Sequence, residues 1–244
     1  MSIRKSCIYT CLSGNYDGIT HPPRDERFDY FVFSDTIEKD RVGVWKVIKI
    51  PSSINKSVTS RLPKILPHKY LRDYEYSLYI DSNLEIADRS FYDLICKKMS
   101  LNILFSLIKH PYRTKTLDEL KQCFIEGKVS LAEYRKEKDV CKRNDMTGDG
   151  VLYENGILLR KHNDNEVVKI DEEWWNNYCQ HVKRDQLWLC PVFNKYKFKP
   201  DLLFPKGISV RNSSMINYHQ HNNRGVKYFR YILLKGRKIF SKFL

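Results

Sequence analysis

The chain alternates between short apolar stretches and longer stretches in which apolar residues recur every three or four positions. Short apolar or alternating runs bounded by turn residues predict strands. We expect these strands at residues 6–11, 29–34, 45–50, 78–80, 84–86, 102–108, 153–160 and 195–199.

Spacing of three to four residues predicts the helices. The first, over residues 57–74, contains Pro63 and Pro67, which indicate a broken helix. Further helices are expected at residues 90–99 and within 117–142, where Gly127 separates two helices. Another spans residues 171–181, with acids in its first turn, and a last one begins at Arg184.

Strands alternate with helices through the first half, which predicts an α/β protein with three layers and a mainly parallel central sheet. The 244 residues are enough for one sizeable core, and no linker divides them. We therefore expect a single domain over residues 1–222, followed by a C-terminal tail over residues 223–244.

Composition narrows the class of protein. Hydrophobic content of 42% and charged content of 30% are ordinary for a globular domain, and no apolar run is long enough to span a membrane. The start lacks the apolar core of a signal peptide, and seven scattered cysteines without a CxxC pair indicate a reducing compartment. These features predict a cytoplasmic location.

The formal net charge of +14 suggests nucleic acid, anionic lipid or a phosphate-rich substrate as a partner. Seven basic residues and no acidic one lie between Arg224 and the C-terminus, with apolar residues at helical spacing. This pattern fits an amphipathic helix on an anionic membrane surface, and equally a basic helix docked on its own domain.

The sharpest candidate site follows the strand at residues 78–80, where Asp81, Ser82 and Asn83 interrupt an apolar run. Open α/β sheets bind ligands at the carboxyl ends of their strands, and oxygen ligands suit Mn²⁺ or Mg²⁺. Asp81 and Asn83 could therefore hold a cation that bridges a diphosphate, with His219 as a third ligand. The alternative is a simple turn, because all three residue types favour turns.

Other residues fit the chemistry of transfer to a hydroxyl group. Asp185 or Glu154 could act as the catalytic base, although Asp185 could also only cap a helix. Arg61, Lys64 and Arg113 could contact phosphates, the alternative being solvated charge on a helix surface.

Several segments in order resemble a family of glycosyltransferase-like domains from bacterial polysaccharide clusters and plant Golgi proteins. They are YTCLSGNYD, DYFVFSD, RLPKILPHKYL, YSLYIDSNLEI, HPYR, ENGILLRKHND, and WW followed by RDQL. The resemblance covers most of residues 7–190 and implies a GT-A-type, Rossmann-like nucleotide-sugar-binding fold. It implies a donor half at about residues 1–110 and an acceptor half at about residues 111–222.

The resemblance also implies roles for individual residues. Those expected around the nucleotide sugar are Thr10, Asn15, Tyr16, Asp35, Arg61, Lys64, Asp81, Ser82 and Asn83. Asp185 would face the acceptor, and His219 would complete the metal site. Those expected at the acceptor are His110, Arg113, Asn155 and Trp175. Asn83 departs from the usual second acid of the metal motif, which weakens the case for strict metal dependence.

Together these features predict a glycosyltransferase that moves a hexose, carried by UDP, to a saccharide or lipid-linked saccharide in surface-polysaccharide synthesis. It would sit on the inner face of the cell membrane through its tail. The rival hypotheses are a nucleic-acid-binding protein that uses its basic charge, and a metal-dependent phosphoesterase built on Asp81 and the histidines.

Overall fold

The computed structural model describes residues 5–14, 18–52, 55–143, 151–219, 234, 236–239 and 241. Its strands are β1 (Ser6–Leu12), β2 (Asp29–Ser34), β3 (Arg41–Val42), β4 (Trp45–Lys49), β5 (Tyr76–Ile80), β6 (Leu84–Ile86), β7 (Phe105–Lys109), β8 (Tyr153–Arg160), β9 (Asp201–Leu202) and β10 (Ile216–Tyr218). Its helices are α1 (Lys56–Ile65), η1 (Pro67–Lys69), α2 (Ser90–Ser100), α3 (Thr116–Ile125), α4 (Leu131–Arg143), α5 (Asn165–Gln180) and α6 (Asp185–Lys195).

In this part of the chain, a large sheet has eight strands in the order β3-β4-β2-β1-β5-β8-β7-β9. Strands β4, β2, β1, β5, β7 and β9 run in one direction, and β3 and β8 run against them. The predicted mainly parallel sheet is therefore confirmed. The chain leaves β1 toward β2 and β4, then returns through α1 to β5 on the other side of β1. This reversal of strand order makes the carboxyl ends of β1 and β5 a ligand-binding position in α/β sheets.

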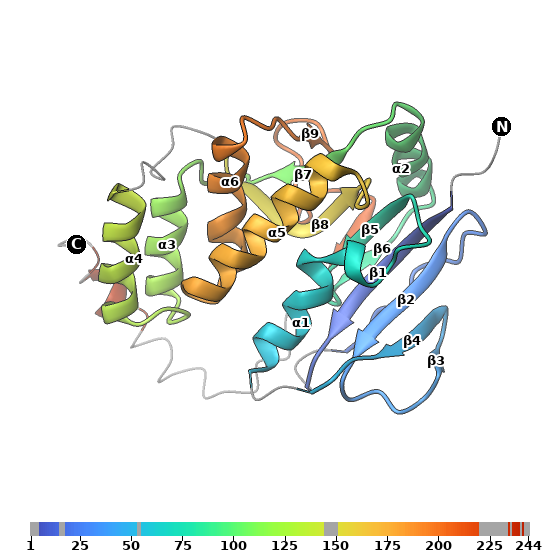
Figure 1. Cartoon of the computed structure of the whole chain (residues 1–244), viewed down its shortest axis with the longest axis horizontal. Helices are drawn as coiled ribbons and strands as arrows, with labels where there is room; N and C mark the ends of the chain where they lie inside the picture. The colour runs from blue at the N-terminus through green and yellow to red at the C-terminus, as the bar shows by residue number, and fades with distance from the viewer. Residues whose placement is uncertain are drawn as a thin grey trace.

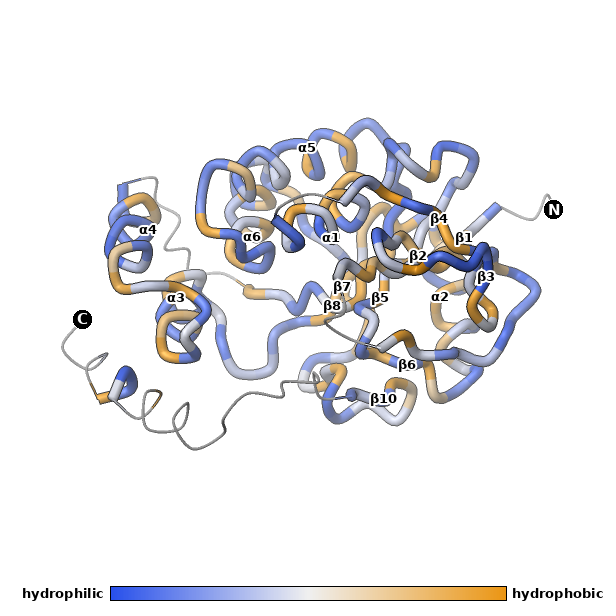
Figure 2. Tube along the Cα trace, turned by 90° about the horizontal axis from the view of Figure 1, so that it is seen from below, coloured by the Kyte–Doolittle hydropathy of each residue, from blue (hydrophilic) through white to orange (hydrophobic). Residues whose placement is uncertain are grey.

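Successive residues of each strand face opposite sides of the sheet, so both faces can pack against helices. The sheet is the middle of three layers. In β1, Tyr9 packs into the core beneath α1, α5 and α6, while Ile8 packs into the core that contains α2. Figures 1 and 2 show α1, α5 and α6 on one face of the sheet, and α2 with the β6–β10 pair on the other. The predicted three-layer α/β fold is confirmed.

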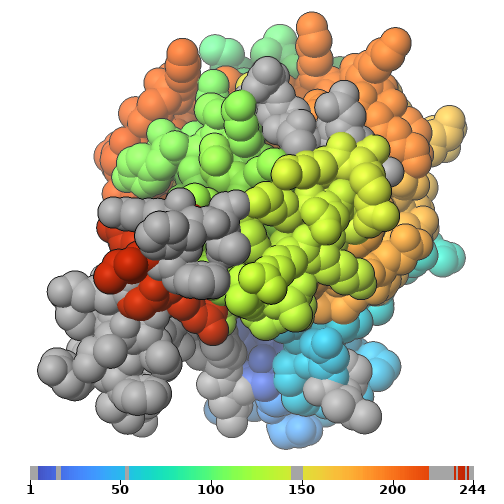
Figure 3. All heavy atoms as spheres, turned by 90° about the vertical axis from the view of Figure 1, so that its left-hand side faces the viewer, coloured from blue at the N-terminus to red at the C-terminus, as the bar shows by residue number. Residues whose placement is uncertain are grey.

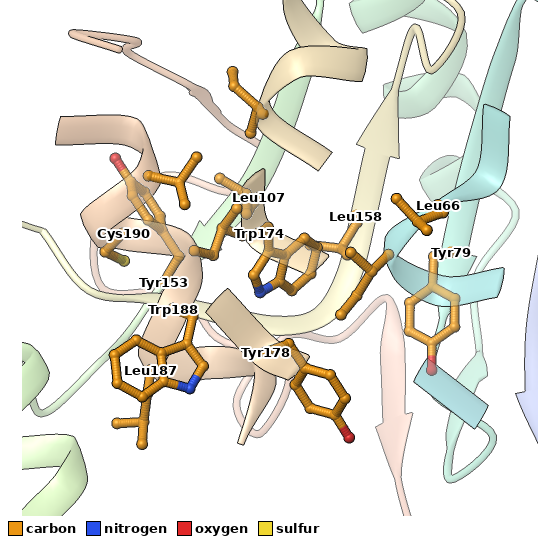
Figure 4. Packing of buried hydrophobic residues seen from close by; sticks show 14 of the residues in the cluster. Leu66, Tyr79, Leu107, Tyr153, Leu158, Trp174, Tyr178, Leu187, Trp188 and Cys190 are labelled. Atoms are coloured by element: carbon orange, nitrogen blue, oxygen red, sulfur yellow. The ribbon is translucent and has the colours of Figure 1, made fainter. Parts of the chain in front are cut away.

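Large side chains fill the space between the sheet and α5 and α6. Trp174 and Trp188 are fully buried, and the indole of each donates a hydrogen bond to a backbone carbonyl, of Asp185 and Val182 respectively. Figure 4 shows both rings in this layer, with Leu107 and Leu158 of the sheet and Tyr178 of α5. The start of α6, which carries Asp185, is thereby fixed against the core.

Two local expectations need correction. The helix expected at residues 171–181 begins at Asn165, because the Asp164 carboxylate caps it by accepting the Glu166 N–H. Asp171 is therefore a fully buried residue in the second turn rather than an acid at the exposed first turn. The strand expected at residues 195–199 is absent from the described structure: Lys195 ends α6, and Lys197 has a φ of 53° that turns the chain.

The broken helix over residues 57–74 is confirmed: α1 contains Pro63, ends at Ile65, and is followed by the single turn η1. The pair of helices separated near Gly127 is also confirmed, as α3 and α4. No described helix is both long and apolar enough to cross a membrane.

Most of the expected C-terminal tail lies outside the described residues. Arg237, which is described, donates to the carbonyls of Phe124 (3.0 Å) and Val129 (3.3 Å), between α3 and α4. Its guanidinium also lies 5.3 Å from the centre of the Phe124 ring. Figure 3 shows this segment in red beside the yellow-green α4. The described part of the tail therefore docks on its own domain.

Candidate functional site at the β1–β5 edge

A cavity of about 610 Å³ opens where β1 and β5 end. Cys11, Leu12 and Ser13 form one wall after β1, and Asp81, Ser82 and Asn83 form another after β5. The starts of α1 and α6 also line it, through Lys56, Ser57 and Ser60 and through Arg184 to Gln186. The cavity therefore lies at the topological switch point, with two positive helix ends facing it.

The rim of the cavity is rich in charge. Its basic members are Lys56, Arg61, Lys64, Lys128 and Arg184, and its acidic members are Asp81, Glu126 and Asp185. Basic side chains outnumber acidic ones, so a ligand with negative charge is favoured.

Lys64 is the most enclosed of these basic side chains, with only 2% of it exposed. Its ammonium lies 2.8 Å from Asp185 Oδ2 and 3.3 Å from Asp81 Oδ1. Arg61 reaches the other oxygen of Asp185 at 3.4 Å. Lys64 thus joins the end of β5 to the start of α6.

Asp185 is held by these two cations rather than left free. Burial alone would raise its pKa, but the charges of Lys64 and Arg61 outweigh burial and hold the pKa well below its ordinary range. A carboxylate with a low pKa is a weak base. The geometry therefore favours a role in positioning Lys64 and Arg61, while the predicted role as base stays a prediction.

Asp81 has a second donor in its own strand. The Tyr79 hydroxyl donates to Asp81 Oδ1 at 2.6 Å, and burial together with the Asp81 charge raises the pKa of that phenol well above its ordinary value. Asp81 Oδ2 faces Gly156 of β8, where an added Cβ would lie 3.3 Å from it and 3.0 Å from Leu84 Cδ1. Gly156 therefore leaves room for this carboxylate.

Two buried donors at the cavity have no hydrogen-bond partner in the described part of the chain. They are Asn155 Nδ2 and Arg184 Nε. Buried polar groups are nearly always paired, so such donors indicate positions where a ligand or water supplies an acceptor.

Of the predicted site residues, the structure brings seven together around this cavity: Arg61, Lys64, Asp81, Ser82, Asn83, Asn155 and Asp185. Asn15 and Tyr16 lie outside the described residues. The others are described but do not line the cavity.

Asp35 and Thr10, two of the predicted residues that do not line the cavity, lie close behind it. The Asp35 carboxylate accepts from Gly14 N (2.9 Å) and Ser13 Oγ (3.2 Å) and pairs with Lys56 at 2.8 Å. It therefore ties the loop after β1 to the start of α1. Thr10 is 1% exposed and points into the protein.

Glu154 and the predicted acceptor residues His110 and Arg113 lie farther along the same edge of the sheet. Glu154 is paired with Arg211 at 2.8 Å. Burial raises the pKa of Glu154, although the hydrogen bonds from Arg211 and the Val210 N–H act to lower it. Arg113 donates to Glu119 at 2.6 Å, and burial lowers the pKa of His110 to about 4. These contacts stabilise the turn after β7.

Trp175 lies on α5, where its ring stacks on Tyr178 with centroids 5.6 Å apart. It is partly buried against the core beneath α5. Its predicted contact with an acceptor stays a prediction.

The predicted metal ligands Asp81, Asn83 and His219 are neighbours in space, but their side chains have other partners. Asn83 Nδ2 donates to the His219 carbonyl at 2.9 Å, and the His219 ring is 2.9 Å from Glu85. In the described residues, no group of three or more His, Cys, Asp or Glu side chains could hold a metal ion. Because Asp81 is engaged by Lys64 and Tyr79, and Asn83 and His219 by other partners, these side chains as arranged do not fit Mn²⁺ or Mg²⁺. The predicted cofactor stays a prediction.

Sequence reasoning missed Lys56, Ser60, Lys128 and Gly156 as members of the site. Lys56 and Ser60 had a usable signal, because they share a helix with Arg61 and Lys64. Lys128 had none, since it reaches the cavity from the turn between α3 and α4.

Comparison with known proteins gives one family and two curated relatives. A family model described as "TOD1/MUCI70, glycosyltransferase-like domain" matches residues 25–221. The chain is 26% identical over 197 residues to "Probable hexosyltransferase MUCI70" of Arabidopsis thaliana, covering 74% of this chain and 33% of that protein. It is 23% identical over 104 residues to "Alkaline ceramidase TOD1" of the same plant, covering 41% of this chain and 21% of that protein. The chain thus spans a third or less of either relative.

Proposed function

The chain belongs to the TOD1/MUCI70 glycosyltransferase-like domain family, and we propose that it transfers a hexose from a nucleoside-diphosphate sugar to a hydroxyl acceptor. One observation carries this proposal: a basic cavity lies at the switch point between β1 and β5. The name of the MUCI70 relative, a probable hexosyltransferase, supports the same reaction class.

The cavity suits the diphosphate of a sugar nucleotide. Arg61 and Lys64 come from one helix and present positive charge beside Asp81, and the helix ends of α1 and α6 add partial positive charge. Arg184 Nε and Asn155 Nδ2 supply donors that lack protein partners in the described structure. These groups would stabilise the negative charge that grows on the departing diphosphate.

In the proposed reaction, an acceptor hydroxyl oxygen bonds to the anomeric carbon as that carbon's bond to the phosphate oxygen breaks. The bonding electron pair leaves with the diphosphate, where the basic side chains offset it. The hydroxyl proton goes to a base, for which Asp185 and Glu154 are the predicted candidates. Glu154 has the higher pKa, but Asp185 is the one that lines the cavity.

The finer parts of the proposal rest on the family resemblance. They are UDP as the carrier, a saccharide or lipid-linked saccharide as acceptor, and a role in surface-polysaccharide synthesis. A location on the inner face of the membrane, held there by the basic tail, is also part of the proposal. The contact of Arg237 with the α3–α4 turn favours the docked alternative for the described part of that tail.

Three rival functions fit the cavity less well. A ceramidase, as the TOD1 relative is named, must hold long apolar chains, whereas charged and polar side chains dominate this rim. A metal-dependent phosphoesterase needs more metal ligands than the described residues bring together. Binding of nucleic acid would use a broad basic surface, whereas Lys56, Arg61, Lys64, Lys128 and Arg184 converge on one cavity.

The test is incubation of the purified protein with UDP-, GDP- and ADP-hexoses and a mixture of oligosaccharide acceptors, with and without Mn²⁺. We expect release of nucleoside diphosphate from one donor class, lost in Asp81→Ala and retained in Asp118→Ala, which changes an exposed acid on α3. Absence of both nucleotide binding and turnover under every condition would refute the proposal.

A further inference from the structure

The Lys64 ammonium occupies the position between the two acids of the cavity. It is 2.8 Å from Asp185 and 3.3 Å from Asp81, and it lies 4.7 Å from the centre of the Tyr79 ring. Burying a lysine costs free energy unless its charge is paired, and here two carboxylates and an aromatic face supply the pairing. A basic side chain paired with two carboxylates therefore lies at the end of β5.

The backbone that carries Lys64 is fixed as well. Arg160 is fully buried and donates to the carbonyls of Lys64 and Ile65, the last residues of α1. The Tyr9 hydroxyl donates to the same Lys64 carbonyl at 3.3 Å, and Asp171 holds Arg160 at 2.9 Å. A cation held this firmly needs little reorganisation when a ligand binds.

A divalent cation would compete for the same carboxylate. Asp81 Oδ1 already accepts from Tyr79 and faces Lys64, and Oδ2 lies against Gly156. A metal ion binds carboxylate oxygens at roughly 2.0–2.6 Å, so it would stand within a few ångströms of the ammonium and be repelled.

No second acid is available to offset that repulsion in the described structure. Asp185 is engaged by Lys64 and Arg61. Glu126 on the cavity rim is paired with Lys128, and Glu85 with His219. The site therefore holds the counter-charge to a diphosphate in its own side chains.

We infer that Lys64 takes the place of the metal ion, so that the nucleoside diphosphate binds without a divalent cation. This inference rests on the proposed function, because it concerns the donor of that reaction. Lys64, with Arg61 beside it, supplies the positive charge that faces the diphosphate. Asp81 and Asp185 then hold Lys64 in place.

Isothermal titration of the full chain with UDP, in EDTA and again in Mn²⁺, tests the inference without any variant. We expect the two dissociation constants to agree within about threefold, since equal affinity means no metal contribution. Binding that is at least about tenfold tighter in Mn²⁺, or found only there, would overturn the inference and leave the proposed function standing. Absence of UDP binding in both buffers would overturn both.

A variant series gives a second test in EDTA. Lys64→Met is expected to weaken UDP binding at least about tenfold, the scale of losing one charge-assisted hydrogen bond. Lys97→Met, which changes an exposed lysine on α2 in the opposite layer, should leave the affinity unchanged. Undiminished UDP affinity in Lys64→Met would overturn the inference.

Lys64→Met leaves two carboxylates without their shared cation, so its fold must be checked by circular dichroism and thermal melting. Lys64→Arg keeps the charge and serves as the conservative variant. We expect it to bind UDP more tightly than Lys64→Met in EDTA. Equal weakening in the two variants would contradict a role based on charge.

Discussion

Asp185 carries a full charge at neutral pH because its carboxylate meets Lys64 at 2.8 Å and Arg61 at 3.4 Å. Only 8% of its side chain is exposed, so water screens these contacts weakly. The charge of Asp185 therefore determines where two of the cavity's basic side chains point. Within the site, acidic side chains therefore hold the basic side chains in position.

Neutralising this acid should release its partners. We expect Asp185→Asn to weaken UDP binding at least about tenfold, because Lys64 and Arg61 lose their shared anchor. The matched control is Asp118→Asn, at an exposed acid. If Asp185 acts only as a catalytic base, the variant will bind UDP normally and lose transfer alone, which would contradict the positioning role.

At the scale of elements, α1 is held to the sheet by a buried ion pair between β8 and α5. Arg160 and Asp171 are both fully buried and 2.9 Å apart, and Arg160 caps the carbonyls at the end of α1. Removing one partner of a buried pair leaves an unpaired charge, which typically costs about 3–5 kcal/mol. The pair thus links the stability of the fold to the position of Lys64.

Arg160→Met should lower the free energy of unfolding in urea by about 3–5 kcal/mol. Arg160→Met combined with Asp171→Leu removes both charges and should recover most of that loss. If the double variant is as unstable as the single one, the loss comes from the uncapped end of α1 rather than from the stranded carboxylate.

The loop after β1 depends on Asp35 in a way that pH can test. Burial acts to raise the pKa of Asp35, but Lys56, Gly14 N–H and Ser13 outweigh it and lower the pKa from 3.8 to about 2. The folded state therefore favours the charged form, and this stabilisation is complete above about pH 4 and lost as pH falls toward 2.

The measurement is the difference in unfolding free energy between the wild type and Asp35→Asn, followed from pH 7 to pH 2.5. We expect the difference to be constant down to about pH 4 and to shrink below it. A difference that does not change over this range would show that the charge of Asp35 contributes nothing.

Elements with a strong local pattern were predictable from the sequence. The apolar run in YENGILLR and the Gly127 break between two helices needed only neighbouring residues, and β8, α3 and α4 appear where expected. The strands β9 and β10 have two or three residues and depend on partners distant in sequence, and β3 has only two residues, so no local pattern marks them.

The same distinction applies to the site. Asp81 was found because an apolar strand stops there. The pairing of Lys64 with Asp185, and of Arg160 with Asp171, arises only when α1, α5 and α6 pack on one face of the sheet. No spacing in the sequence encodes those contacts.

On the scale of the whole molecule, the C-terminal segment contributes to the cavity. Leu234 is among the residues that line it, and Arg237 anchors the segment to the carbonyls that end α3. The described residues of this segment therefore lie against the domain, with Leu234 beside the cavity.

We expect Arg237→Ala to cost about 1 kcal/mol, the loss of hydrogen bonds at a partly exposed site, and to speed cleavage of the C-terminal segment by trypsin. Lys238→Ala, at the exposed neighbouring residue, removes one tryptic site in the same way and is the control. Equal cleavage rates in the two variants would contradict an anchoring role for Arg237.

We propose that the β1–β5 cavity binds the nucleoside diphosphate of a sugar donor. Hydrogen–deuterium exchange with and without UDP tests it most directly, because it reports where the nucleotide binds. We predict slower exchange at residues 11–14, 81–84 and 184–188, which surround the cavity. Protection instead around Arg41 and Lys46, which line a second cavity at the other end of the sheet, or no protection at all, would contradict the claim.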